Sequence, residues 1–116
     1  MSNTAPEFRI TLSGQITPAD VAELARMGVK TVVNNRPDFE EEGQPTSDEI
    51  EQACQAHGIV YKQIAFAGGM MDMNHVQAFA DFFNETERPL HIFCRTGNRS
   101  NNLLTVAREK DLLDEE

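Results

Sequence analysis

The sequence predicts an α/β fold in which helices cover both faces of a mainly parallel sheet of four or five strands. Short apolar stretches alternate with helical patterns along the 116 residues, an order typical of three-layer α/β/α proteins with right-handed crossovers. The helical patterns also carry recognisable start and stop residues. The length suits one domain, residues 1–116, built around a single set of packed layers.

The first half of the chain predicts a strand, a helix and a second strand. Residues 8–12 alternate apolar and polar side chains, as in a half-exposed strand. Thr17 is a suitable N-cap and Pro18 a suitable first helical residue, while Gly28 ends the helix. Residues 29–34 are rich in β-branched side chains, which favours a short buried strand.

The second half repeats this alternation. Thr46 opens a second helix with a capping box and Gly58 ends it, after which residues 59–66 form the next expected strand. Cys54 lies on the apolar face of that helix, so we expect it in the core. Asp72 precedes a third helix, whose buried stripe is Val76, Phe79, Ala80 and Phe83.

An apolar run over residues 90–93 leads into a tight loop, residues 94–100, between the last strand and the last helix. Several backbone N–H groups at a helix N-terminus have no intrahelical partner, so such a loop attracts anions. Gly97 suits a position that requires positive φ. We therefore predict an anion-binding loop whose members are Arg95, Thr96, Gly97 and Asn98.

Three side chains of this loop indicate nucleophilic catalysis. The Cys94 thiol, with an ordinary pKa of about 8.5, should be a thiolate at neutral pH because helix N-termini and adjacent cations lower that pKa. Arg99 offers a planar fork for two oxygens of an oxyanion. Ser100 carries a hydroxyl that can donate to the thiolate when it leaves. An isolated buried cysteine is usually inert, so the prediction depends on the combination.

The loop that follows the second predicted strand contributes further candidates. The carboxyl ends of parallel strands meet at one edge of a sheet, so Arg36 and Asp38 are expected in a crevice near Cys94. The three glutamates at residues 40–42 are interpreted as a solvated loop. Asp72 is the remaining crevice candidate, although its position favours an N-cap over a catalytic acid.

Residues 94–99 resemble two known active loops. Protein tyrosine and dual-specificity phosphatases have five residues between their cysteine and arginine, rhodanese sulfurtransferases have a shorter loop, and this chain has four. Together with residues 12–16 and 28–38, the loop resembles the phosphatase-like domain of the beta-lactamase hydrolase-like protein family. The resemblance implies a protein tyrosine phosphatase-like fold over nearly the whole chain.

Three functions compete, and sulfur transfer ranks first. In this interpretation Cys94 takes a sulfane sulfur from thiosulfate or a persulfide and passes it to an acceptor, which requires no general acid. The alternative is a Cys-dependent phosphatase, whose leaving oxygen is usually protonated by a general acid. Residues 67–71, where phosphatases of this fold carry that acid, are glycines and apolar residues. A non-catalytic anion-binding module ranks third.

The amino-acid composition limits the kinds of molecule that this protein is expected to bind. A net charge of -9 argues against nucleic acids and anionic membranes, so a small anionic sulfur or phosphate compound is the expected substrate. Two cysteines and the lack of a long apolar run favour the cytoplasm. Three scattered histidines predict no metal site, and we expect no cofactor. The resemblance also implies a persulfide dioxygenase partner, since related domains occur beside such enzymes.

Overall fold

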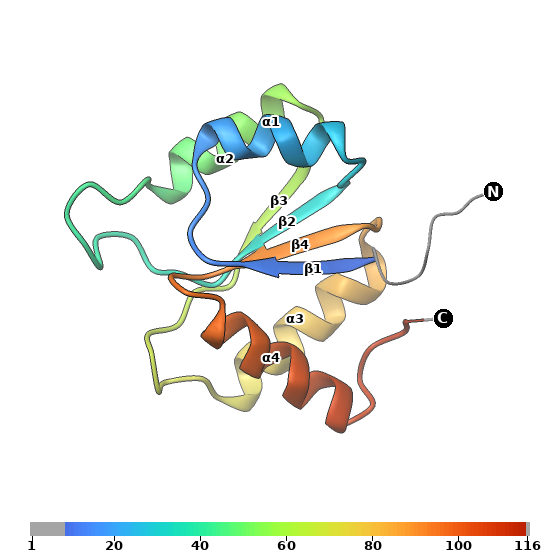
Figure 1. Cartoon of the computed structure of the whole chain (residues 1–116). Coiled ribbons are helices and arrows are strands. Elements are labelled where there is room, and N and C mark those ends of the chain that lie inside the picture. The colour runs from blue at the N-terminus through green and yellow to red at the C-terminus, as the bar shows by residue number, and fades with distance from the viewer. Residues whose placement is uncertain (1–8, 116) are drawn as a thin grey trace.

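A computed structural model describes residues 9–115 as a four-stranded parallel sheet with two helices on each face (Figure 1). The strand order is β1-β4-β2-β3. Helices α1 and α2 lie on one face, and α3 and α4 lie on the other. The elements, in chain order, are β1 (Ile10–Ser13), α1 (Pro18–Arg26), β2 (Thr31–Asn34), α2 (Ser47–Ala56), β3 (Val60–Gln63), α3 (Met73–Glu85), β4 (Leu90–Phe93) and α4 (Asn98–Glu109). The predicted α/β architecture is confirmed.

The centre of the sheet is β4, which pairs with β1 on one side and with β2 on the other. Phe93, the last residue of β4, is opposite both Ser13 and Asn34, the last residues of those two neighbours. Three strands therefore end level with one another. Cys94 follows Phe93 directly, so the chain leaves the sheet at the edge where the loops after β1, β2 and β3 also gather (Figure 1).

Local capping fixes where the helices begin. Thr17 and Thr46 each accept a hydrogen bond from the backbone N–H three residues later, and each forms a complete capping box. Asp72 caps α3 in the same way, with His75 as its reciprocal partner. The three predicted N-caps are confirmed.

Two apolar clusters fill the space on either side of the sheet. The cluster under α1 and α2 includes Cys54, which is fully buried as predicted. The four residues predicted as the stripe of α3, namely Val76, Phe79, Ala80 and Phe83, are all buried, and the cluster under α3 and α4 contains Val76, Phe79 and Phe83. Neighbouring residues of β4 face opposite clusters, since Ile92 belongs to one and Phe93 to the other.

Three strands differ from the predicted ranges. The second, expected over residues 29–34, begins at Thr31, because the Val29 N–H still donates to the Leu24 carbonyl of α1. The predicted strand over residues 59–66 ends at Gln63, because its partner β2 ends at Asn34 and the chain then enters a loop. Ile64 and Phe66 nevertheless remain buried, and this burial explains the strand-like pattern. The first strand begins at Ile10, and Phe8, which was included in its predicted range, lies outside the described residues.

The part of the chain that the structure describes has no helix long and apolar enough to cross a membrane. Within residues 9–115, no group of three or more His, Cys, Asp or Glu side chains is arranged to hold a metal ion.

The turn after β1 packs directly against the loop that begins at Cys94. The Ser13 carbonyl accepts from the Cys94 N–H at 3.4 Å, and the Gln15 N–H donates to the Arg95 carbonyl at 3.2 Å. A Cβ atom on Gly14 would lie 2.8 Å from the Arg95 carbonyl oxygen, a distance that side chains do not tolerate. Glycine at this position therefore permits the close approach of the two loops.

We predict that Gly14→Ala lowers the free energy of unfolding by about 1–3 kcal/mol, because the added methyl group must push two backbone segments apart. Urea denaturation followed by circular dichroism measures this loss. Gly68→Ala is the matched control, since a Cβ atom there has no neighbour within 4 Å. Equal stability of the two variants would contradict the close contact.

Candidate active site

Cys94 lies buried between the end of β4 and the start of α4. Gly97, with φ of 97°, is the N-cap of α4 and donates its N–H to the Cys94 Sγ at 3.1 Å. Burial alone would raise the pKa of the Cys94 thiol. Hydrogen bonds from Ser100 and from the Thr96 and Gly97 amides outweigh that effect, so the pKa of Cys94 is lowered. The loop therefore favours the thiolate, the nucleophilic form.

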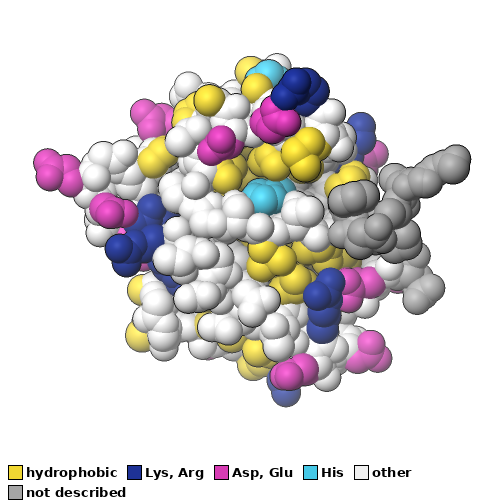
Figure 2. Space-filling model, in the orientation of Figure 1, with side chains coloured by type: hydrophobic (Ala, Val, Ile, Leu, Met, Phe, Trp, Pro, Cys, Tyr) yellow, Lys and Arg dark blue, Asp and Glu magenta, His cyan; other side chains and the backbone are white. Residues whose placement is uncertain are grey.

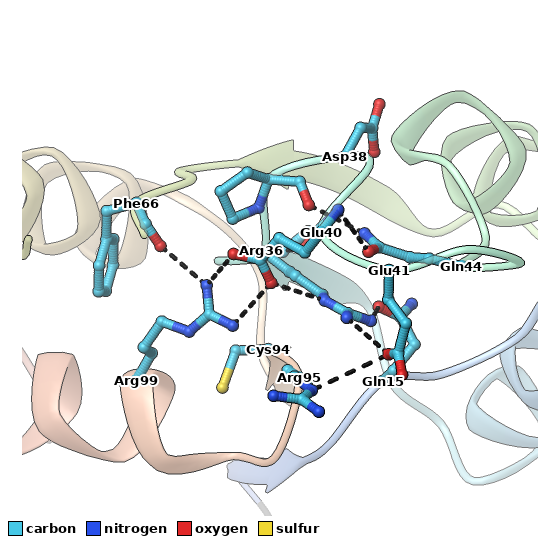
Figure 3. Close-up of polar contacts among 12 residues, drawn as sticks. Gln15, Arg36, Asp38, Glu40, Glu41, Gln44, Phe66, Cys94, Arg95 and Arg99 are labelled. Atoms are coloured by element: carbon cyan, nitrogen blue, oxygen red, sulfur yellow. Dashed lines mark hydrogen bonds and ion pairs between the residues drawn. The ribbon is translucent and has the colours of Figure 1, made fainter. Parts of the chain in front are cut away.

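Arg99 lies in the first turn of α4, and its guanidinium is hydrogen-bonded to Glu40 and to the Phe66 carbonyl (Figure 3). Nη1 and Nη2 donate to the two carboxylate oxygens of Glu40 at 2.8 Å each, and Nη1 also donates to the Phe66 carbonyl at 3.0 Å. The side chain is 14% exposed. The fork is thus held in place by a carboxylate, an anion with the bidentate geometry that suits arginine.

Arg36 is buried, with 2% of its side chain exposed, and it supports Glu40 from behind. Its Nε donates to Glu40 at 2.9 Å, Nη2 donates to Glu41 at 3.0 Å, and Nη1 donates to the Gln15 Oε1 at 2.9 Å. The predicted crevice residue Arg36 is therefore close to the Cys94 loop, but its donors are directed at the glutamates and Gln15.

The interpretation of Glu40 as a solvated loop residue is wrong. Its backbone is at the surface, but its side chain is only 23% exposed and joins Arg99 to Arg36. The hydrogen bond from Arg99, opposed by burial and reinforced by Arg36, lowers the pKa of Glu40 to about 2. Glu40 follows Arg36 by four residues, but only the turn over residues 37–42 brings the pair onto Arg99. No local pattern in the sequence indicates that turn.

Asp38 does not lie in the crevice where the sequence analysis placed it. Its Oδ1 accepts from the Ser47 N–H at 2.7 Å, at the N-terminus of α2. In Figure 3 its carboxylate points away from Cys94. The chain turns back between Asp38 and Ser47 so that the carboxylate meets an orphan helix amide, an interaction that the macrodipole favours.

Asp72 serves as the N-cap of α3, which was the preferred of its two interpretations. Its Oδ1 accepts from the Asn74 N–H at 2.9 Å and from the His75 N–H at 3.2 Å. The His75 Nδ1 in turn accepts from the Asp72 N–H at 3.0 Å. The carboxylate is thereby occupied by its own helix.

Ser100 is buried beside Cys94, but its hydroxyl donates to the Asn35 Oδ1 at 2.9 Å. Asn35 is held by a hydrogen bond from its Nδ2 to the Ile64 carbonyl at 2.8 Å. A hydroxyl has one proton to donate, so in this structure it is directed at Asn35. The Ser100 side chain also contributes to the lowered pKa of Cys94, so its hydroxyl lies near the thiol and can donate to a departing thiolate by rotating away from Asn35.

A hollow of about 520 Å³ lies beside Arg99 and is lined by Glu40, Glu41, Gly68, Arg95 and Arg99. Figure 2 shows arginine and acidic side chains gathered at the edge of the molecule where the loops after the strands lie in Figure 1. Arg95 is 60% exposed, and its Nε lies 3.9 Å from Glu41. Of the other predicted loop residues, Thr96 and Asn98 are exposed, and the Asn98 N–H donates to the Thr96 hydroxyl.

The sequence analysis gave His91 no role, yet this buried side chain supports the site from below. Its ring nitrogens lie 2.7 Å from the Thr11 hydroxyl and 2.8 Å from the Ser13 hydroxyl, and Ser13 donates to the Gly14 carbonyl. Burial lowers the pKa of His91 to about 4, so the ring is neutral at neutral pH. The sequence offered one sign of this role, since His91 is the only polar residue in the otherwise apolar run over residues 90–93.

Comparison with known proteins shows that this chain is similar in sequence to beta-lactamase hydrolase-like proteins. A beta-lactamase hydrolase-like protein of Agrobacterium fabrum is 33% identical over 103 residues, which cover 89% of this chain and 24% of that protein. One from Xylella fastidiosa is 29% identical, with the same coverage. The chain therefore spans about a quarter of the length of these curated relatives.

Solved structures agree on the fold. A Neisseria meningitidis protein, provisionally named a phosphatase, matches with a TM-score of 0.80 and 32% identity, over 85% of this chain and 70% of that one. The catalytic core of the PP-IP phosphatase Siw14 from S. cerevisiae matches with a TM-score of 0.68 over 87% of this chain and 60% of its own. At 17% identity the second match shows the fold alone. The predicted protein tyrosine phosphatase-like fold is confirmed.

The family model of the phosphatase-like domain of the beta-lactamase hydrolase-like protein matches residues 4–110, which include all eight helices and strands. The chain belongs to this family of phosphatase-like domains.

Proposed function

We propose that this domain is a Cys-dependent phosphatase. The observation that carries the proposal is the buried Cys94 thiol, with a lowered pKa, held by loop amides at the N-terminus of α4 and next to Arg99. The Cys94 thiolate attacks the phosphorus of a phosphate ester, an S–P bond forms, and the P–O bond to the leaving group breaks. Water then attacks the phosphocysteine, which releases phosphate and restores the thiolate.

Arg99 binds the phosphoryl oxygens in this proposal. Its fork now holds the two oxygens of Glu40, so a bound phosphate must exchange with at least one of them. Loop amides at a helix N-terminus supply further donors for an oxyanion, and they need no reorganisation during the reaction. Membership of a phosphatase-like family supports this chemistry over sulfur transfer, which ranked first on the sequence alone.

Sulfur transfer remains the second candidate because two observations favour it. The loop has four residues between Cys94 and Arg99, one fewer than in tyrosine phosphatases. Asp38 and Asp72, the two carboxylates predicted in the crevice, both accept hydrogen bonds from helix amides and are not available as general acids. Under this candidate a persulfide dioxygenase would be the partner that consumes or supplies the sulfur.

We predict that Cys94→Ser abolishes hydrolysis of p-nitrophenyl phosphate while circular dichroism shows an unchanged fold. Turnover by the serine variant would remove Cys94 from the mechanism.

Arg99→Lys should reduce kcat/KM for p-nitrophenyl phosphate roughly 10²-fold, because an ammonium cannot form the two-pronged contact to an oxyanion. Arg108→Lys, in the last turn of the same helix and 49% exposed, is the matched control.

The ionisation of Cys94 gives a second prediction. The rate of alkylation by iodoacetamide follows the thiolate fraction, which rises with pH through the pKa. We expect the midpoint for Cys94 to lie below about 8.5, the ordinary value for a free thiol. Cys54 provides an internal contrast, since burial, reinforced by Glu51, raises its pKa to about 11. A Cys94 midpoint at or above the ordinary value would contradict the activated nucleophile.

The two chemistries leave different groups on Cys94. Rapid acid quenching during turnover of p-nitrophenyl phosphate, followed by intact mass analysis, should show a gain of one phosphoryl group that is absent in Cys94→Ser. Incubation with thiosulfate should leave the mass unchanged. A gain of one sulfur atom from thiosulfate, without any phosphoryl adduct, would instead select sulfur transfer.

A further inference from the structure

The carboxylates around Cys94 are poorly suited to protonate a leaving group. Glu40 is held ionised, since Arg99 and Arg36 lower its pKa to about 2. Glu41, the other carboxylate lining the hollow, accepts from Arg36 at 3.0 Å. Asp38 and Asp72 are each engaged by helix amides. Among the described residues, no carboxylate near the thiol is positioned as a general acid.

The histidine in the first turn of α3 is also engaged. His75 accepts from the Asp72 N–H through Nδ1, and its ring packs on Phe66 with centroids 4.9 Å apart. The Phe66 carbonyl accepts from Arg99. A poor leaving group such as an alkoxide gains typically 10²- to 10⁴-fold in rate from general acid catalysis. The site is therefore best suited to a leaving group that departs without a proton.

A second observation concerns charge at the rim of the hollow. Arg36 donates to Glu40 and Glu41, and Arg99 donates to Glu40 and the Phe66 carbonyl, with only 2% and 14% of their side chains exposed. Arg95 is instead 60% exposed, with its closest carboxylate at 3.9 Å. That distance is too long for a hydrogen bond. In the view of Figure 3, Cys94 lies between Arg95 and Arg99. Arg95, the residue that follows Cys94, therefore presents open guanidinium donors at the rim of the hollow.

From these two observations we propose that the substrate is a diphosphate ester, from which Cys94 removes the terminal phosphoryl group while Arg95 binds the inner phosphate. This deepens the proposed phosphatase function and rests on it. An S–P bond forms as the bridging P–O bond breaks, and the electron pair stays on the bridging oxygen of the departing phosphate monoester. The second pKa of a phosphate monoester is about 6, so this group leaves as an anion. Water then hydrolyses the phosphocysteine, and its proton passes to solvent.

A diphosphate ester would explain both the lack of a positioned general acid and the exposed guanidinium of Arg95. A phosphoanhydride needs no acid, and its inner phosphate carries negative charge to the side of the site where Arg95 is open. Arginine matches phosphate oxygens bidentately. The hollow of about 520 Å³ extends from Arg99 to Arg95, so one ligand can contact both.

The test compares n-butyl diphosphate, n-butyl phosphate and p-nitrophenyl phosphate, with release of inorganic phosphate as the measurement. The first two share the same alcohol and differ in the leaving group. We expect kcat/KM for n-butyl diphosphate to exceed that for n-butyl phosphate at least 10²-fold, the size of the missing acid contribution. One phosphate should be released per n-butyl diphosphate.

Arg95→Gln should lower the ratio of kcat/KM for n-butyl diphosphate to that for p-nitrophenyl phosphate at least tenfold, and Arg95→Lys should lower it less. Arg26→Gln, which changes an exposed arginine on α1, should leave the ratio unchanged. Equal turnover of the two butyl compounds, or an unchanged ratio in Arg95→Gln, would overturn the inference while Cys94-dependent hydrolysis of p-nitrophenyl phosphate still supported the phosphatase. Loss of that hydrolysis in the wild-type protein would overturn both.

Discussion

The site depends on one ionic connection, in which the Glu40 carboxylate joins Arg36 to Arg99. A guanidinium as buried as that of Arg36 is tolerated only when its donors are paired. Glu40 and Glu41 provide that pairing, and Glu40 also holds the fork of Arg99. The loop after β2 is thereby fixed to the start of α4. Since the pKa of Glu40 is about 2, the connection persists throughout the neutral range.

The opposite side of the Cys94 loop is fixed by neutral hydrogen bonds. Because the Ser13 hydroxyl donates to the Gly14 carbonyl, it must accept from the His91 Nε2, which leaves Nδ1 to accept from Thr11. This tautomer is compatible with a pKa of about 4. The central strand therefore orients the turn after β1, and that turn contacts the backbone of the Cys94 loop. Cys94 is therefore held by the sheet as well as by its own loop.

The sequence predicted features that depend on residues close together in the chain, such as helix caps. It missed contacts between side chains that are far apart in the chain. The N-caps at Thr17, Thr46 and Asp72 were recognisable because capping joins residues two or three positions apart. The strand order was implied only by the family resemblance. Glu40 and Asp38 were misplaced because their partners, Arg99 and Ser47, are brought to them by a turn without a sequence signature. The choice of Cys94 as the candidate nucleophile followed from the loop motif, but the hydrogen-bond partners of the residues around it required the tertiary structure.

Because Arg36 and Arg99 share the Glu40 carboxylate, the free-energy cost of replacing Glu40 by another anion at Arg99 is small. If a phosphoryl group displaces Glu40 from the fork, the carboxylate is not left as an unpaired charge, because the Arg36 Nε still donates to it at 2.9 Å. Arg99 likewise keeps its hydrogen bond to the Phe66 carbonyl. Each group thus retains a partner on both sides of the exchange. Without Arg36, the Glu40 carboxylate would be left without a charged partner whenever another anion took its place on Arg99. Under the proposed function, the buried Arg36 therefore contributes to anion binding at Arg99.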